Sequence, residues 1–219
     1  MAGNGNASYI DSLLEARKAM SDELASTLFP IADDVKVQVE FNPAMVASYR
    51  LIGYETRMLR REDFKDDKVD AGDIGAGHSV TALYEITSVG AKQSLVDPLR
   101  YQRERERTDR QNSQHGDELA FVKLRYKLPL ESASRLIEHP VRAASALGSL
   151  DAAPAEQRFA IAVAAFAQRL RGESALESFG YADIAALANA ARGSDAEGYR
   201  AELVRLVRMA DTLHTVGGR

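Results

Sequence analysis

The residues best suited to chemistry lie in one acidic loop, residues 62–73, which is followed closely by a histidine. Carboxylate oxygens are the ligands that hard cations such as calcium prefer. A metal-binding or hydrolytic unit would use Asp66, Asp67, Asp70, Asp73 and His78. The spacing does not match an EF-hand loop, which needs acids at alternate positions and a glutamate at the twelfth. A solvated loop, partly balanced by Lys65 and Lys68, is therefore the simpler interpretation.

Other motifs that carry chemistry are incomplete in this sequence. Gly72, Gly75 and Gly77 lack the GK[ST] ending and the following helix of a phosphate-binding loop. No two of the four histidines lie within one helical turn, so the sequence offers no local metal pair. A GxSxG motif is absent. We predict no enzyme activity, and we assign no catalytic or cofactor-binding residue.

Composition narrows the classes of partner. The net charge of −4 and the pI near 5.7 argue against a nucleic-acid surface, so no nucleic-acid partner is expected. The absence of cysteine excludes disulfides, thiolate metal sites and cysteine nucleophiles. No run approaches the roughly 20 apolar residues of a membrane span, so none is predicted.

Alternating apolar and polar residues predict strands in the middle of the chain. In the first, Val35, Val37 and Val39 are expected to face the core, and Lys36, Gln38 and Glu40 to face water. Strands with one buried and one wetted face are typical of an antiparallel sheet, and their number favours a sandwich. The predicted strands are Val35–Phe41, Ala47–Glu55, Ser79–Thr87, Leu119–Leu128 and Leu136–Val141.

Helical patterns occupy both ends of the chain. A capping box at Ser8 and Asp11 opens an apolar stripe that continues to about Ala25. Near the C-terminus, Ser194 and Glu197 form a second capping box, which is expected to open the last helix. The two helices before it are predicted at Pro154–Arg171 and Tyr181–Arg192.

Together these elements predict an α+β fold. Residues 34–142 are expected to form an antiparallel β-sandwich-like domain, interrupted by long loops at 60–78 and 92–117. A small helical bundle at residues 150–216 is expected to pack on the sheet. Residues 1–33 form the N-terminal helix and a linker.

Several long segments resemble one bacterial family. The helix YIDSLLEARKAM followed by TLFPIADDVKVQVEFNP resembles the end of a von Willebrand factor type A (VWA) domain and its junction with the next domain. The segments VASYRLIGYETR, EDFKDDKVDAGDIGAGHSVTALYEI and LAFVKLRYKLP are similar to that family's C-terminal domain of unknown function. The helix at about residues 9–25 is thus identified as the remnant of a VWA domain. The DxSxS metal motif of a VWA domain is absent here, so Mg²⁺ is expected only in the absent VWA domain.

The resemblance implies a non-enzymatic accessory or protein-interaction region that scaffolds the VWA metal-dependent adhesion site. It also implies a periplasmic or cell-envelope setting for the full-length protein. Without its VWA partner, the N-terminal helix is expected to be disordered, to dock on the sandwich, or to form a homodimer. The metal-binding or hydrolytic unit remains one alternative. A carbohydrate-binding sandwich is another, although the absence of tryptophan and 7% aromatic content count against it.

Overall fold

The computed structural model describes residues 10, 12–22, 28–53, 59–67, 69, 71–91, 115–173, 176 and 179–217. Its helices and antiparallel strands confirm the predicted α+β class. The chain divides into two compact units. The sheet unit comprises residues 1–50, 54–80 and 85–145, and the helical unit comprises residues 51–53, 81–84 and 146–219. The narrower domain boundaries proposed from the sequence stay predictions.

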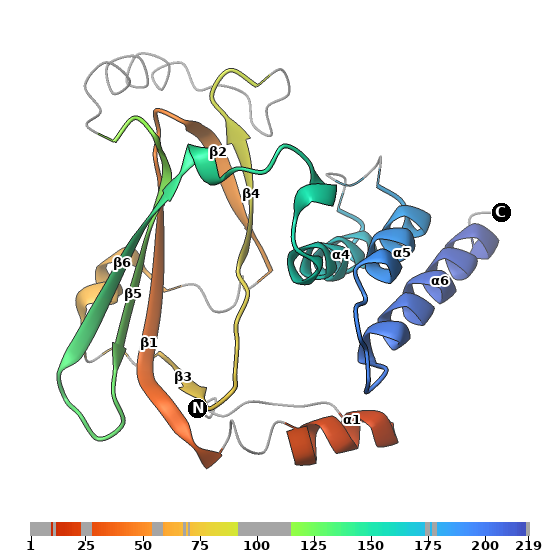
Figure 1. Cartoon of the computed structure of the whole chain (residues 1–219), viewed down its shortest axis with the longest axis horizontal. Helices are drawn as coiled ribbons and strands as arrows, with labels where there is room; N and C mark the ends of the chain where they lie inside the picture. The colour runs from red at the N-terminus through yellow and green to blue at the C-terminus, as the bar shows by residue number, and fades with distance from the viewer. Residues whose placement is uncertain are drawn as a thin grey trace. The chain divides into compact units, whose positions relative to one another are not determined.

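The sheet unit is built on a four-stranded antiparallel sheet with the strand order β3-β1-β5-β6 (Figure 1). β1 and β5 lie in its middle because their alternating residues pair along most of their length. β6 and the short β3 form the edges. The strands are β1 (Pro30–Phe41), β3 (Gly72–Gly75), β5 (Glu118–Lys127) and β6 (Ser134–Arg142).

A second, two-stranded sheet pairs β2 (Val46–Ile52) with β4 (Leu83–Ser88). The Arg50 Nε donates to Glu85 Oε2 at 2.6 Å, which joins the two strands by an ion pair. The ring centroids of Phe41 and Tyr49 lie 4.4 Å apart, so β1 and β2 also contact each other through aromatic side chains.

A β-bulge in β1 decides which side chains face inward. Asp33 pairs with Lys127 and Lys36 with Arg125, so two residues of β1 lie opposite the single residue Tyr126. Just beyond the bulge, Lys36 and Val37 face opposite to the sides predicted from the sequence, whereas Glu40 is exposed as predicted. Lys36 is 2% exposed although it was expected to face water, and Val37 is 57% exposed although it was expected in the core. The segment 59–67 covers the polar face near Lys36 and accounts for this inversion.

Several predicted boundaries also need correction. The expected loop 60–78 contains a 3-10 turn at Arg61–Lys65 and the strand β3, whose two glycines give no alternating signal. The strand expected at Ser79–Thr87 begins only at Leu83. Of the expected loop 92–117, residues 92–114 lie outside the described part of the chain, and residues 115–117 form a turn.

The N-terminal helix differs from its predicted form. α1 (Leu13–Arg17) continues into a π-helical turn at Lys18–Asp22. The Ser12 Oγ accepts the Glu15 N–H at 3.2 Å and caps the helix. The predicted capping pair, Ser8 and Asp11, lies outside the described residues.

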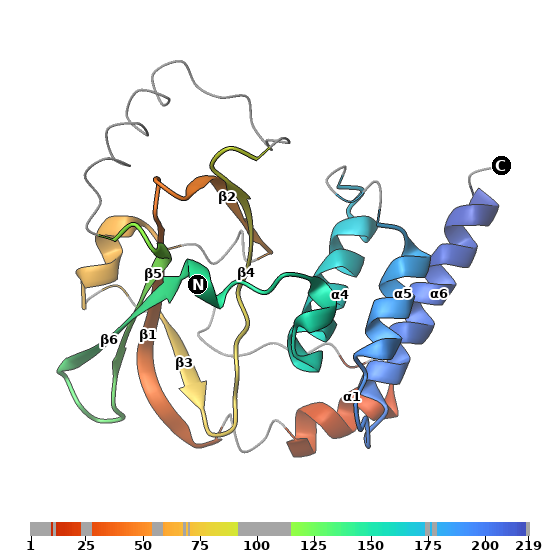
Figure 2. The same cartoon turned by 45° about the horizontal axis from the view of Figure 1, so that its top comes forward.

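The helical unit consists of α4 (Ala155–Leu170), α5 (Tyr181–Ala190) and α6 (Tyr199–Gly217), drawn from cyan to blue in Figure 2. α5 contacts both other helices. Small side chains allow this close packing, and Ile184 and Val207 are fully buried between them. Gly172 and Gly193 adopt positive φ after α4 and α5, as expected of helix stops. The core residues are Ala162, Ala165, Tyr181, Ile184, Ala185, Ala188, Val204 and Val207.

None of the helices in the described ranges is long and apolar enough to cross a membrane.

Candidate functional site

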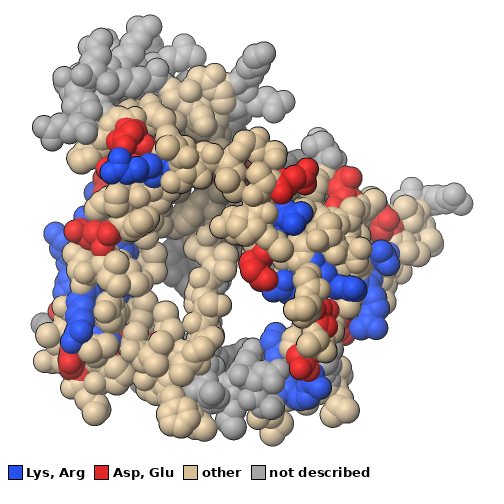
Figure 3. Space-filling view, in the orientation of Figure 1, with Lys and Arg blue, Asp and Glu red and all other residues tan. Residues whose placement is uncertain are grey.

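A cluster of charged residues lies on one face of the four-stranded sheet, where the segment 59–67 meets β1, β5 and β6. Lys36 and Arg125 are direct cross-strand partners, so their side chains share this face. Charges of both signs alternate along the visible side of this sheet (Figure 3). We call the charged cluster the set Asp34, Lys36, Asp66, Asp67, Arg125, Lys127 and Ser134.

Lys36 lies at the buried centre of the charged cluster. Its side chain has no exposed area, and Nζ donates to the Asp66 main-chain oxygen at 2.6 Å. The same Nζ lies 3.2 Å from Asp34 Oδ1 and donates to Oδ2 at 3.4 Å. A buried ammonium group needs such oxygen atoms because its transfer out of water is costly.

Asp34 connects Lys36 to a second lysine. Its Oδ2 lies 2.9 Å from Lys127 Nζ, and its backbone N–H donates to Asp73 Oδ1 at 3.2 Å. Its φ of 53° lies in the left-handed region, which is strained for a residue with a side chain. The Oδ1 atom is close to Lys36 but accepts no hydrogen bond from the described residues, so that contact is an ion pair without hydrogen-bond alignment. The bulge in β1 and two ammonium groups thus hold this carboxylate in place.

Asp67 ties the segment 59–67 to the sheet. The Ser134 Oγ donates to its Oδ1 at 2.5 Å, and Arg125 Nη2 donates to both carboxylate oxygens, at 3.0 and 3.1 Å. The Ser134 hydrogen bond lowers the pKa of Asp67 most, and Arg125 lowers it further against the opposing effect of desolvation. The carboxylate is therefore held in its ionised form.

Lys127 completes the charged cluster from β5. Its hydrogen bond to Asp34 is the largest influence and raises the pKa of the Lys127 ammonium group. Lys127 also donates to the Asp67 main-chain oxygen at 3.3 Å. Lys36 on β1 and Lys127 on β5 thus bind main-chain oxygens of the segment 59–67, and Arg125 on β5 binds its Asp67 carboxylate. These contacts hold that segment on the sheet.

The metal-ligand candidates from the sequence do not converge on one point in the described structure. Asp67 is engaged by Arg125 and Ser134, Asp66 presents its main-chain oxygen to Lys36, and Asp73 accepts the Asp34 N–H. His78 follows β3, and its backbone N–H donates to the Gly75 oxygen at 3.1 Å. Asp70 lies outside the described residues. Among the residues that are described, no three His, Asp or Glu side chains are grouped so as to hold a metal ion.

The sequence pattern missed Lys36, Arg125 and Ser134 as members of this cluster. Basic residues recur at alternate positions of β5, at Lys123, Arg125 and Lys127, and an acidic segment in the same domain offers their counter-charges. This balance of charges was the signal in the sequence that could have indicated the charged cluster. Alternation alone assigned these lysines and arginines to water.

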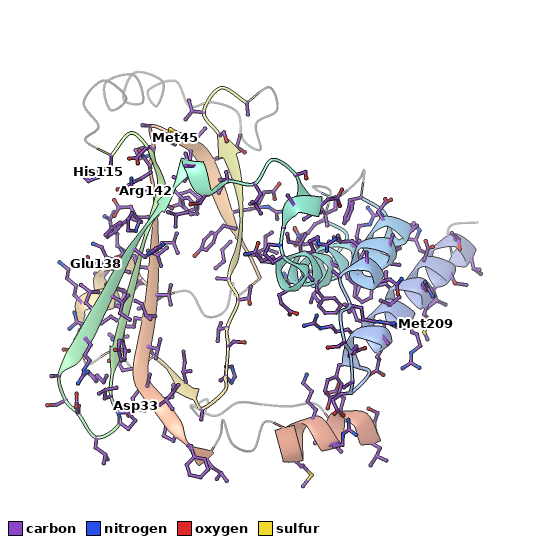
Figure 4. All side chains as sticks on the ribbon, viewed as in Figure 1. Asp33, Met45, His115, Glu138, Arg142 and Met209 are labelled. Atoms are coloured by element: carbon purple, nitrogen blue, oxygen red, sulfur yellow. The ribbon has the colours of Figure 1, made fainter. Side chains whose placement is uncertain are left out.

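A second surface feature is an exposed apolar stripe along α6 in the helical unit. The α6 stripe consists of Leu206, Met209, Leu213 and Val216, with exposed fractions of 47, 58, 65 and 71%. Their 3-4-3 spacing places them on one side of the helix, apart from the buried Val204 and Val207. Figure 4 shows Met209 projecting from the outer side of α6. The apolar positions predicted for this helix from the sequence are Tyr199, Leu203, Leu206, Val207 and Ala210. This set includes the exposed Leu206 and omits the buried Val204.

A third feature is a run of exposed apolar residues at the N-terminal side of the sheet unit. On α1, Leu13 is 88% exposed, and Met20 in the following π-helical turn is 72% exposed. Leu28, Phe29 and Ile31, around the start of β1, are each more than half exposed. We call these five residues the N-terminal apolar surface.

Two comparisons with known proteins identify relatives. A family model described as "Uncharacterized protein YfbK, C-terminal" matches residues 26–213. A protein of Escherichia coli (strain K12), described as "Uncharacterized protein YfbK", is 47% identical over 210 residues. The match covers 95% of this chain and 35% of the relative, so the chain spans about a third of that relative's length. No solved structure matches this chain.

Proposed function

Because the chain belongs to the family described as the C-terminal region of YfbK, we propose that it is a non-enzymatic interaction region within a longer polypeptide. Its role in this proposal is to bind and position a neighbouring domain. The neighbour is the VWA domain that the sequence resemblance implies. In the same proposal the two sheets pack as a sandwich, and the full-length protein works in the periplasm or cell envelope.

The N-terminal apolar surface is the observation that supports this proposal. Large exposed apolar side chains are typical of surfaces that another protein covers, and these five residues lie within a short stretch of the sequence. Leu13 and Met20 precede residue 26, where the family match begins, and Leu28, Phe29 and Ile31 follow it closely. The surface therefore lies at the boundary of the family region, where a neighbouring domain would be attached.

The charged cluster supports a structural role for the acidic segment rather than a catalytic one. Its carboxylates and main-chain oxygens are already bound by lysine and arginine side chains. The metal-binding and carbohydrate-binding alternatives stay predictions, and no contact among the described residues favours either.

The test is binding in trans between this chain and the part of the E. coli relative that lies outside the matched 210 residues. We expect the two to co-elute from a sizing column. Burial of Leu13 and Met20 would contribute roughly 3 kcal/mol, so replacing both with lysine should weaken binding by at least about a hundredfold.

A matched control changes the charge equally on the other side of the same helix. The double variant Glu15→Gln with Ala19→Lys alters the net charge as much as Leu13→Lys with Met20→Lys, and it should bind like the unmodified chain. The proposal is wrong if the unmodified chain does not bind, or if the two double variants bind equally well.

A further inference from the structure

The α6 stripe belongs to the helical unit, whereas the N-terminal apolar surface belongs to the sheet unit. Four apolar side chains at 3-4-3 spacing reproduce the pattern by which one helix packs against another. The buried side of α6 already contacts α5 through Val204 and Val207, so the stripe remains available for a second partner.

Basic side chains accompany the stripe. Arg205 and Arg208 are both exposed, and neither guanidinium group forms an ion pair or hydrogen bond with the residues that the structure describes. Lys and Arg side chains are visible over α6 in Figure 3. By contrast, Arg200 at the start of the same helix is bound by Glu156. Glu202 and Asp211 lie about one turn from Arg205 and Arg208 on the same helix, but no ion pair joins them to these arginines among the described residues.

From this charge pattern we propose that the α6 stripe docks a helix of another protein region that carries acidic residues beside its own apolar stripe. The apolar side chains would supply most of the affinity. Arg205 and Arg208 would select acidic flanks and set the orientation of the partner helix, as flanking charges do in paired helices.

A second copy of this chain would satisfy these charges poorly. In a symmetric antiparallel pair, Met209 would lie opposite Leu213 of the second copy, and Leu206 opposite Val216. Arg205 would then face Gly217, and Arg208 would face His214. A parallel pair would bring like charges together. In this register and in the parallel pair, neither arginine lies directly opposite an acidic residue.

A membrane surface is also less suitable than a helix. Interfacial helices carry many basic residues and place large aromatic side chains on the apolar face. The α6 stripe has no aromatic residue and only two arginines beside it, and the acidic Glu202 and Asp211 belong to the same helix. The net charge of −4 further opposes binding to anionic lipid.

Two synthetic helical peptides, used with the full chain, test the proposal. One has leucine at the 3-4-3 positions and glutamate on both sides, and the other has lysine in place of glutamate. Fluorescence anisotropy should show binding of the acidic peptide and at least tenfold weaker binding of the basic one. Leu213→Asp should abolish binding, whereas Thr215→Asp adds the same charge away from the stripe and should not.

The charge swap keeps the proposal falsifiable even if one variant folds poorly. The double variant Arg205→Glu with Arg208→Glu should bind the acidic peptide about tenfold more weakly and gain affinity for the basic peptide. Equal binding of both peptides, or binding of neither, would overturn the proposal. Self-association of the chain would also overturn the proposal if Leu213→Asp removes it. The same holds for sedimentation of the chain with phosphatidylcholine–phosphatidylglycerol vesicles.

Discussion

The Lys36 ammonium group is buried in the sheet unit against oxygen atoms from two residues. Asp34 supplies a carboxylate from the same strand, and Asp66 supplies a main-chain carbonyl from the acidic segment. Since Lys127 shares the Asp34 carboxylate, the arrangement contains two cations and one anion at close range. Arg125 and Asp67 form the neighbouring pair, and Ser134 fixes its geometry.

Replacing Lys36 with methionine should destabilise the sheet unit by about 2 kcal/mol. Breaking an isolated buried pair costs roughly 3–5 kcal/mol, but Asp34 keeps Lys127 as a partner here. Urea unfolding followed by hydrogen exchange of β1 peptides measures the loss. Lys123→Met is the matched control, because Lys123 is more exposed and lies 3.9 Å from Glu138, so it should cost less than about 1 kcal/mol. Equal losses in the two variants would contradict the buried pair.

The pKa of Asp67 should rise when its serine partner is removed. The Ser134 hydrogen bond is the largest cause of the lowered pKa, so Ser134→Ala should move the carboxyl titration, followed by ¹³C NMR, upward toward 3.8. In the unmodified protein, the pKa of Asp67 is lower in the folded state than its ordinary value of 3.8. Ionised Asp67 therefore stabilises the fold fully above pH 3.8, and this stabilisation is lost as the pH falls through the lower folded-state pKa. Thr215→Ala in the helical unit should leave the titration unchanged. An unmoved midpoint in Ser134→Ala would show that Arg125 and Lys127 lower the pKa of Asp67 without the serine.

At the scale of elements, polar contacts hold the first turn of α6 in addition to its apolar packing through Val204 and Val207. Asp195 accepts the backbone N–H groups of Ala201 at 2.7 Å and Arg200 at 3.1 Å. Burial raises the pKa of Asp195, but these hydrogen bonds outweigh it and leave the pKa lowered. The Arg200 guanidinium binds Glu156 and lies 4.7 Å from the Phe159 ring centroid, which joins α6 to α4.

The capping residue of α6 is therefore Asp195, and not Ser194 as the sequence pattern predicts. Asp195→Ala should destabilise the helical unit by about 1 kcal/mol, because two N–H groups at the helix start lose their acceptor. Ser194→Ala should have less than half that effect. Urea unfolding followed by circular dichroism at 222 nm compares the two. A larger loss in Ser194→Ala would restore the sequence assignment.

At the scale of the whole molecule, the two units are stabilised differently. The helical unit has a contiguous apolar core rich in alanine, whereas the fully buried apolar residues described in the sheet unit are few, among them Val46, Phe64 and Ala120. Charged contacts around Lys36 and Asp67 supplement that small core. The predicted effects on Lys36 and Asp195 should accordingly appear in different units.

The positions of β5, β6, α4 and α5 were predictable because strong alternation or helical periodicity and clear stop signals coincide there. The short β3 was not, because pairing with β1 stabilises it and its own residues carry no pattern. The charged cluster also depends on contacts between distant segments, such as Arg125 with Asp67, which no local pattern encodes. The α6 stripe is visible in the sequence, but only burial of the other side of the helix reveals that it is exposed.

The β-bulge in β1 also limits how this stretch can change length during evolution. Side chains on a strand alternate between faces, so removing one residue between Asp33 and Lys36 would reverse the facing of one part of β1 relative to the other. Either Lys36 would lose its contacts with Asp34 and Asp66, or the pairing of β1 with β5 would shift by one residue. Single insertions and deletions should therefore be rejected here, although substitutions at the exposed Val37 are tolerated. We therefore expect changes in the length of this strand to be tolerated less well than changes in several of its side chains.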